Sequence, residues 1–237
     1  MRKTKQVDVG GVKIGGGAPV AIQSMSTFSP VDTAFAAAQI NALGKAGADI
    51  VRVAVPDRRA AEALKDLKAL VSIPLVADIH FDYHLALTAI DSGIDALRIN
   101  PGNIGRRENV VKVVEKAAER SVPIRIGINA GSLPADLLDK YGGHPTAEGM
   151  VEGALRHVQI LEEEGFHDIV ISVKSTDVPM MVKANRMLSQ KVGYPLHLGV
   201  TEAGTLYRGT IKSAIGIGAL LLDGIGDTIR VSLTDDP

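Results

Sequence analysis

The amino-acid sequence predicts a TIM (β/α)8 barrel, in which eight parallel strands form a ring inside a layer of helices. Three observations support this fold class. Apolar runs rich in β-branched residues recur eight times, at residues 20–25, 49–55, 74–79, 96–101, 123–130, 168–175, 195–201 and 228–233. Stretches with helical spacing lie between them and are clearest at residues 57–70, 107–121, 146–165 and 178–192. Spacers of this length suit the right-handed crossovers that join parallel strands, and eight such repeats close a barrel, whereas a doubly wound open sheet is the alternative.

The two ends of the sequence modify this barrel. Within residues 1–19, the segment 7–14 has Gly10-Gly11 at its centre and is typical of a small hairpin, which we expect to cover the barrel bottom. The eighth apolar run ends at Leu233 and the sequence at Pro237, so the helix that should cover the last strand is missing. We therefore expect one barrel domain over residues 1–237 that lacks its last helix.

Composition excludes several classes of function. With 26 Lys and Arg against 27 Asp and Glu, the chain has no global attraction to nucleic acid or anionic membranes. It contains no Cys, so it cannot by itself hold a disulfide, a thiolate zinc site or a Cys-ligated iron–sulfur cluster. No signal-peptide pattern is recognisable, and the longest apolar run is far shorter than the roughly 20 residues that span a bilayer. We expect a cytoplasmic protein with neither nucleic acid nor membrane as a partner.

Side chains alternate between the two faces of a strand, and here one face of each strand is aliphatic while the other is mostly polar. In the first run the adjacent Gln23 and Ser24 leave the inward face ambiguous. The predicted inward set of the other strands is Arg52, Ala54, Asp78, His80, Arg98, Asn100, Arg125, Gly127, Asn129, Ser172, Lys174, His197, Thr201, Arg230 and Ser232. Barrel interiors are normally filled by Val, Ile and Leu, so this polarity requires an explanation.

The charges of the inward set predict an anion site. Five cations (Arg52, Arg98, Arg125, Lys174 and Arg230) against Asp78 and Glu202 leave 5 − 2 = 3 positive charges in excess. Burying an unpaired ion costs several kcal/mol, whereas each charge-assisted hydrogen bond to a bound anion contributes about 1.5 to 3 kcal/mol. Two or more phosphates match four arginines and a lysine better than a single carboxylate does. A purely structural network of salt bridges is the alternative.

Two further patterns favour structural explanations. His80 and His84, with Asp78 and Asp82, resemble a metal site, but we expect His84 beyond the strand, on the surface of the next helix. Gly216 and Gly218 follow no strand, so the pair indicates close helix packing rather than a nucleotide-binding loop. We therefore predict no metal site.

Seven motifs occur in order along the chain: QVDVGGVKIGGGAPVAIQSM, ADIVRVAVP, PLVADIHFDY, LRINPGNIG, PIRIGINAGSL, PLHLGVTEAG and GIGDTIRVSLTDDP. Together, from Lys3 to Pro237, they resemble the barrel domain of the 4-hydroxy-3-methylbut-2-enyl diphosphate synthase family, the iron–sulfur reductases of the non-mevalonate isoprenoid pathway. The resemblance implies reductive ring opening and dehydration of 2-C-methyl-D-erythritol 2,4-cyclodiphosphate to 4-hydroxy-3-methylbut-2-enyl diphosphate. A cyclic diphosphate is the kind of anion that the charge count predicts.

The resemblance also implies parts that this sequence does not contain. Family members continue into a smaller domain in which three Cys and one Glu hold a 4Fe–4S cluster, and a homodimer places that cluster over the partner's barrel mouth. Flavodoxin or ferredoxin supplies the electrons. We therefore expect this chain to be the substrate-binding half, which binds no cluster and is inactive alone.

Site roles carried over by position complete the resemblance. The resemblance implies that the diphosphate is bound by Arg52, Arg98, Arg125, Lys174 and Arg230, with hydrogen bonds from Asn100, Asn129 and Ser232. The catalytic set near the reacting carbons is His80, His197, Thr201 and Glu202, with Asp78 orienting its neighbours. Glu202 is either a counter-ion for the arginines or the donor of the proton with which the substrate oxygen leaves as water.

Two competing functions come from other classes. An aldolase or pterin-synthase type of barrel enzyme would also bind a phosphorylated substrate, and its aldolase form would use Lys174, the single inward lysine, for imine chemistry. A non-catalytic anion-binding module would bind the anion without turnover.

Overall fold

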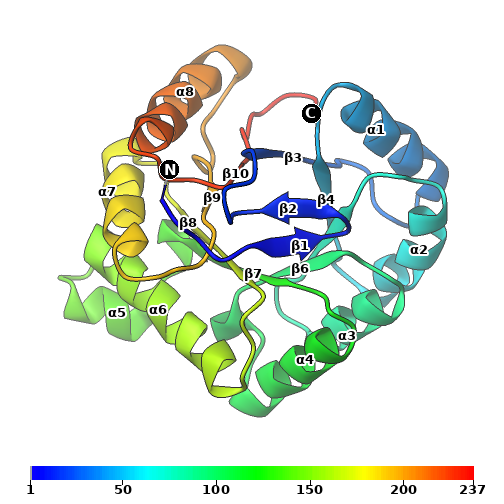
Figure 1. Cartoon of the computed structure of the whole chain (residues 1–237), viewed down its shortest axis with the longest axis horizontal. Coiled ribbons are helices and arrows are strands. Elements are labelled where there is room, and N and C mark those ends of the chain that lie inside the picture. The colour runs from blue at the N-terminus through cyan, green and yellow to red at the C-terminus, as the bar shows by residue number, and fades with distance from the viewer. Residues whose placement is uncertain (1) are drawn as a thin grey trace.

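Eight parallel strands form a ring at the centre of the computed structural model, which describes residues 2–237 (Figure 1). Their order is β8-β7-β6-β5-β4-β3-β10-β9, and a parallel bridge between Ile171 and Leu196 joins the two ends of this series. The strands are β3 (Ala21–Met25), β4 (Ile50–Ala54), β5 (Leu75–Asp78), β6 (Ala96–Ile99), β7 (Ile124–Asn129), β8 (Ile169–Lys174), β9 (His197–Leu198) and β10 (Thr228–Ile229). This closed, parallel arrangement confirms the predicted barrel and contradicts the open sheet.

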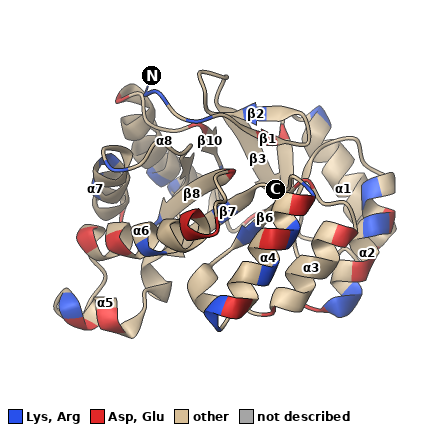
Figure 2. Cartoon of the chain, turned by 60° about the horizontal axis from the view of Figure 1, so that its bottom comes forward, with Lys and Arg blue, Asp and Glu red and all other residues tan. Residues whose placement is uncertain are grey.

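Helices surround the ring, as Figure 1 shows. They are α1 (Thr33–Lys45), α2 (Arg58–Ala69), α3 (Tyr83–Asp91), α4 (Arg107–Glu119), α5 (Ala135–Lys140), α6 (Ala147–Glu163), α7 (Val178–Ser189) and α8 (Leu206–Leu222), with short 3-10 turns at Pro101–Asn103 and Ala130–Ser132. Four helices begin where the sequence supplies an acceptor, because the carboxylates of Asp57, Asp82 and Asp177 and the hydroxyl of Thr146 accept from backbone N–H groups of the first turn. Basic and acidic residues are interleaved along outer helices such as α2 and α4 (Figure 2).

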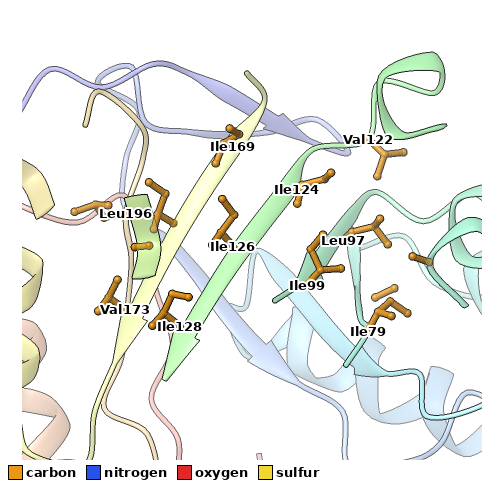
Figure 3. Packing of buried hydrophobic residues seen from close by; sticks show 14 of the residues in the cluster. Ile79, Leu97, Ile99, Val122, Ile124, Ile126, Ile128, Ile169, Val173 and Leu196 are labelled. Carbon is orange, nitrogen blue, oxygen red and sulfur yellow. The ribbon is translucent and has the colours of Figure 1, made fainter. Parts of the chain in front are cut away.

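The main core lies between the ring and these helices. Ile124, Ile126 and Ile128 of β7 are almost completely buried, and Figure 3 shows them beside Leu97 and Ile99 of β6. Burying each such side chain contributes roughly 1.5 to 3 kcal/mol. Because these aliphatic residues occupy every second position, the intervening polar residues must face the barrel interior.

A hairpin covers the amino ends of the strands. Strands β1 (Val7–Val9) and β2 (Val12–Ile14) pair antiparallel, and the turn is made by Gly10 and Gly11, both with positive φ. The side chains of Val7, Val9 and Ile14 pack with residues at the amino ends of the barrel strands, such as Ile50. The predicted hairpin at the barrel bottom is therefore confirmed, and Figure 1 shows it across the ring.

The last strand is shorter than predicted. β10 ends at Ile229, and from Arg230 the chain makes single backbone hydrogen bonds, from Arg230 N–H to Leu198 and from Thr234 N–H to Gly204. No helix follows β10 in the described residues. Between α8 and α1, Ile22 on the outer face of β3 is 48% exposed (Figure 1).

The outer helices also explain the glycine pair. A Cβ on Gly216 of α8 would lie 2.7 Å from the Met181 methyl of α7, so close helix packing requires this glycine. Gly218 has nothing within 4 Å of such a Cβ and does not serve that purpose.

Along residues 2–237, no helix is both long and apolar enough to cross a membrane.

Candidate anion-binding site in the barrel mouth

The carboxyl ends of the strands surround a cavity, at the face where TIM barrels carry their active sites. Ten of the thirteen predicted site residues line it: Arg52, Asp78, His80, Arg98, Arg125, Asn129, Lys174, Thr201, Arg230 and Ser232. Met25, Ser172 and Val200 complete the lining. The strand alternation thus brought five cations from five different strand positions to one cavity.

Asp78 at the end of β5 binds two of these cations. Its Oδ1 lies 3.0 Å from Arg98 Nη1 and its Oδ2 lies 3.3 Å from Arg52 Nε, while His80 Nε2 is 3.5 Å away. Burial raises the pKa of the Asp78 carboxyl, but the hydrogen bond from His80 and the charges of Arg52 and Arg98 outweigh burial and hold the pKa well below its usual range. Asp78 is therefore ionised and orients the two arginines. Gly127 on β7 leaves room for this pair, because a Cβ there would collide with the Arg98 guanidinium.

Arg125 lies deeper, and neutral groups hold it. Its Nη1 donates to Gln23 Oε1 and lies 3.3 Å from His197 Nδ1. Burial, followed by the charge of Arg52, lowers the pKa of the Arg125 guanidinium well below its usual value. A fully buried cation without a carboxylate partner is costly, so the deep part of the cavity favours binding of an anion.

Met25 contacts two arginines at once. Its Sδ lies 2.8 Å from Arg52 Nη2 and 3.0 Å from Arg230 Nη1, and Arg230 Nη2 donates to Ser232 Oγ at 2.8 Å. Burial and the charge of Arg52 lower the pKa of Arg230 to about 10. A thioether is a weak, uncharged acceptor, so it positions both guanidiniums without neutralising either.

Sequence reasoning missed Gln23 and Met25 as site residues. Both lie on the face of β3 that points into the barrel, while Ile22 and Ser24 lie on its other face. This settles which face of β3 is the inward one. The register places Met25 beside Arg52 of β4. The available signal was the alternation itself, but adjacent polar residues concealed its phase.

Three predicted site residues lie outside the cavity lining. Glu202 is exposed at the rim, in a turn with φ of 49°, so it is not the second carboxylate that the charge count assumed. Asn100 follows the end of β6 and turns to accept from the Gly102 N–H at 3.2 Å, because the strand alternation stops at Ile99. His197 is completely buried below the cavity, where its Nδ1 is 3.3 Å from Thr228 Oγ1 and its Nε2 has no partner in the described structure.

Correcting the charge count strengthens the anion prediction. Five lining basic side chains against Asp78 alone leave an excess of 5 − 1 = 4 basic groups. His197 adds none at neutral pH, since burial and the neighbouring Arg125 lower its pKa well below the usual value.

His84 is exposed on α3 and pairs with Asp82, so it lies on the helix surface as predicted.

Comparison with known sequences gives one family match and many close relatives. Residues 4–237 match the family model described as the GcpE TIM-barrel domain. The chain is 60% identical over 235 residues to the 4-hydroxy-3-methylbut-2-en-1-yl diphosphate synthase (flavodoxin) of Geobacter sulfurreducens, an alignment that covers 99% of this chain and 66% of that protein. The enzyme of the same name from Symbiobacterium thermophilum is also 60% identical, with 99% of this chain and 63% of that protein covered. The chain thus spans about two thirds of the length of these relatives.

Solved structures with the same fold are much more distant in sequence. Dihydropteroate synthase from Thermus thermophilus superposes with a TM-score of 0.70 at 16% identity, covering 98% of this chain and 93% of that chain. 3-Dehydroquinate dehydratase from Geobacillus kaustophilus gives a TM-score of 0.67 at 15% identity, covering 100% and 91%. These similarities show the barrel fold alone.

Proposed function

Because the chain belongs to the GcpE TIM-barrel domain family, we propose that its barrel mouth binds the cyclic diphosphate substrate of a 4-hydroxy-3-methylbut-2-enyl diphosphate synthase. The reaction is the reductive ring opening and dehydration of 2-C-methyl-D-erythritol 2,4-cyclodiphosphate. Within it, this barrel is the half that holds the substrate.

The excess of four basic groups in one cavity supports the proposal most strongly. A cyclic diphosphate offers two phosphoryl groups, and several arginine forks can each bind their oxygens in pairs. A structural salt-bridge network does not account for Arg125, Lys174 and Arg230, which have no carboxylate partner among the described ion pairs.

The residues divide into two groups by depth and charge. In the proposal, Arg125, Lys174 and Arg230 bind the diphosphate directly, while Arg52 and Arg98 bind it from the side of Asp78. Asn129 and Ser232 add hydrogen bonds to its oxygens. His80 and Thr201, nearer the rim, face the reacting carbons. His197 acts through Arg125, which it contacts, rather than on the substrate.

The redox chemistry belongs to another part of the relatives. The described residues contain no group of three His, Cys, Asp or Glu side chains arranged for a metal ion, and the chain has no Cys, so its residues do not fit an iron–sulfur cluster. The proposal assigns the 4Fe–4S cluster to the third of the relatives' length that this chain does not span. In this proposal flavodoxin, which the relatives' names mention, is the electron donor. The active form is a homodimer in the cytoplasm.

Calorimetric titration with the cyclic diphosphate tests this function. We expect saturable binding that weakens as salt increases, and Arg125→Ala should reduce the affinity about tenfold or more, which corresponds to about 1.4 kcal/mol. Arg58→Ala, on the exposed surface of α2, is the matched control and should bind as the parent does. Equal affinities of the two variants would refute the placement.

A further inference from the structure

We propose that the outer face of α8 (Leu206–Leu222) binds the same face of a second copy of this chain. The two α8 helices run antiparallel about a two-fold axis that passes between residues 214 and 215. The inference rests on the homodimer in the proposed function and adds its contact surface. Its evidence lies on α8 alone and does not depend on the anion site.

The outer face of α8 is apolar. In residues 2–237, five of the twelve exposed large apolar side chains belong to this one helix. The outward positions are three or four residues apart, as on one helix face, and are occupied by Tyr207, Ile211, Ala214, Ile215, Gly218 and Leu222. Ile215 is 60% exposed and Leu222 is 91% exposed. Outer helices such as α2 and α4 carry interleaved charges instead (Figure 2), so the face of α8 has the character of an interface.

This face is complementary to itself when two helices are antiparallel. A two-fold interface brings the same patch of both copies together, so each position must match the one that the axis places opposite it. An axis between residues 214 and 215 forms three kinds of pair: Ile211 with Gly218, Ala214 with Ile215, and Tyr207 with Leu222. The two central pairs each combine a large side chain with a small one, so the facing side chains can interdigitate.

Gly218 supports this register. Glycine destabilises a helix interior, so its presence in α8 requires a reason. A Cβ on Gly218 would have nothing within 4 Å in a single copy, so packing within the chain does not supply that reason. Close approach of Ile211 from the second copy does.

The charged groups at the two ends of α8 also match this arrangement. Arg208 is exposed in the first turn, which contains no acidic residue, and Asp223 caps the last turn, where Arg186 of α7 pairs with it at 2.7 Å. Arg208 and Asp223 each lie at the unfavourable end of their own helix dipole. In the antiparallel pair, Arg208 lies about 3 Å along the helix from the level of the second copy's Asp223. Each charge then lies at the favourable end of the other helix, near an opposite charge.

A second copy fits this face better than other occupants do. The six outward positions carry no charge, so they offer an acidic or basic protein nothing to recognise. A patch that matches its own reversal is required by a two-fold contact and by no unrelated partner. If the part of the relatives that this chain does not span covered α8 instead, the chain alone would remain monomeric.

Sedimentation velocity of the chain over a range of concentrations tests the proposal. We expect a reversible equilibrium between monomer and dimer. Gly218→Leu should raise the dimer dissociation constant about tenfold or more, because the added side chain overlaps Ile211 of the second copy. In dilute, monomeric solution its unfolding midpoint in urea should stay the same or rise, since leucine favours a helix more than glycine does. Ala118→Leu enlarges an exposed alanine of α4 and is the matched control, which should dimerise as the parent does.

Further variants test the register of the two helices. Ile211→Ala added to Gly218→Leu should restore most of the dimer, because it exchanges the large and the small side chain. The chain has no Cys, so introduced thiols report on this contact alone. A mixture of Ile211→Cys and Gly218→Cys chains should form an intermolecular disulfide readily. Gly218→Cys alone should not, since its two thiols lie about 10 Å apart along the helices.

The outcomes separate this contact from the anion site. A chain that stays monomeric, or a dimer that Gly218→Leu leaves intact, would overturn the proposal. Calorimetry should show that Gly218→Leu binds pyrophosphate as the parent does, and loss of both properties would count against the contact, because the substitution would then disturb the barrel. If the parent dimerises through α8 but does not bind pyrophosphate, the anion site is refuted and the α8 contact stands.

Discussion

Arg125 of β7 donates a hydrogen bond to Gln23 of β3, a strand on the opposite side of the barrel. A neutral amide therefore fixes the deepest arginine of the cavity. An amide satisfies a guanidinium N–H but leaves its positive charge available to an anion, which a carboxylate would not.

This relationship predicts opposite effects for two substitutions at Gln23. Gln23→Glu should weaken pyrophosphate binding by about tenfold, because a carboxylate would pair with Arg125, while the free energy of unfolding stays the same or rises. Gln23→Leu should lower the free energy of unfolding by about 1 to 3 kcal/mol, because a buried guanidinium N–H loses its acceptor. Calorimetry and urea denaturation measure the two effects. The control Gln159→Glu makes the same chemical change on the surface of α6, and a similar loss of affinity in that variant would contradict the assignment.

Met25 is predicted to organise Arg52 and Arg230 through its sulfur. Met25→Leu conserves volume and removes the acceptor, so pyrophosphate affinity should fall a few fold while the free energy of unfolding changes by less than about 1.5 kcal/mol. Met187→Leu makes the same change on α7, away from the cavity, and should leave the affinity unchanged. Calorimetric titration of both variants with pyrophosphate tests this prediction. Equal affinities would mean that the contact of the Met25 sulfur has no effect on binding.

Lys174 should make the stability of the chain depend on pH. Its pKa in the folded state is lowered, whereas in the unfolded chain it is about 10.4, so between these values the unfolded state binds more protons. The free energy of unfolding therefore rises with pH in this window, by at most about 1.4 kcal/mol per pH unit.

Lys174→Met removes this titration and is the reference variant. The difference in the free energy of unfolding, wild type minus variant, should increase from pH 7 to pH 9 in urea denaturation. A difference that stays constant over this range would show that Lys174 is protonated in the fold.

The barrel and most of the cavity lining were predictable because strand alternation is a local property. Arg52, Arg98 and Lys174 lie within regular strands, where every second side chain must face inward. Asn100 lies beyond the end of β6, where its side chain turns to accept from the Gly102 N–H, so the alternation does not extend to it. Turn geometry depends on contacts between distant segments, which one sequence does not reveal.

Glu202 has two open roles, as a counter-ion for the arginines or as a proton donor, and its position disfavours the first. Its side chain is exposed at the rim and does not line the cavity, so removing its charge should hardly affect an anion bound inside. For this chain we expect Glu202→Gln to leave the pyrophosphate affinity within about twofold, because charges in contact with water are strongly screened.

In the longer enzyme, where another domain would close over the rim, the same variant should keep substrate affinity within a few fold and lower turnover roughly 100-fold, the usual contribution of a general acid. Glu163→Gln on the exposed side of α6 is the matched control and should change neither quantity. Measuring both constants is decisive, because a counter-ion would alter affinity and leave turnover at saturation nearly intact, the reverse of what this position predicts.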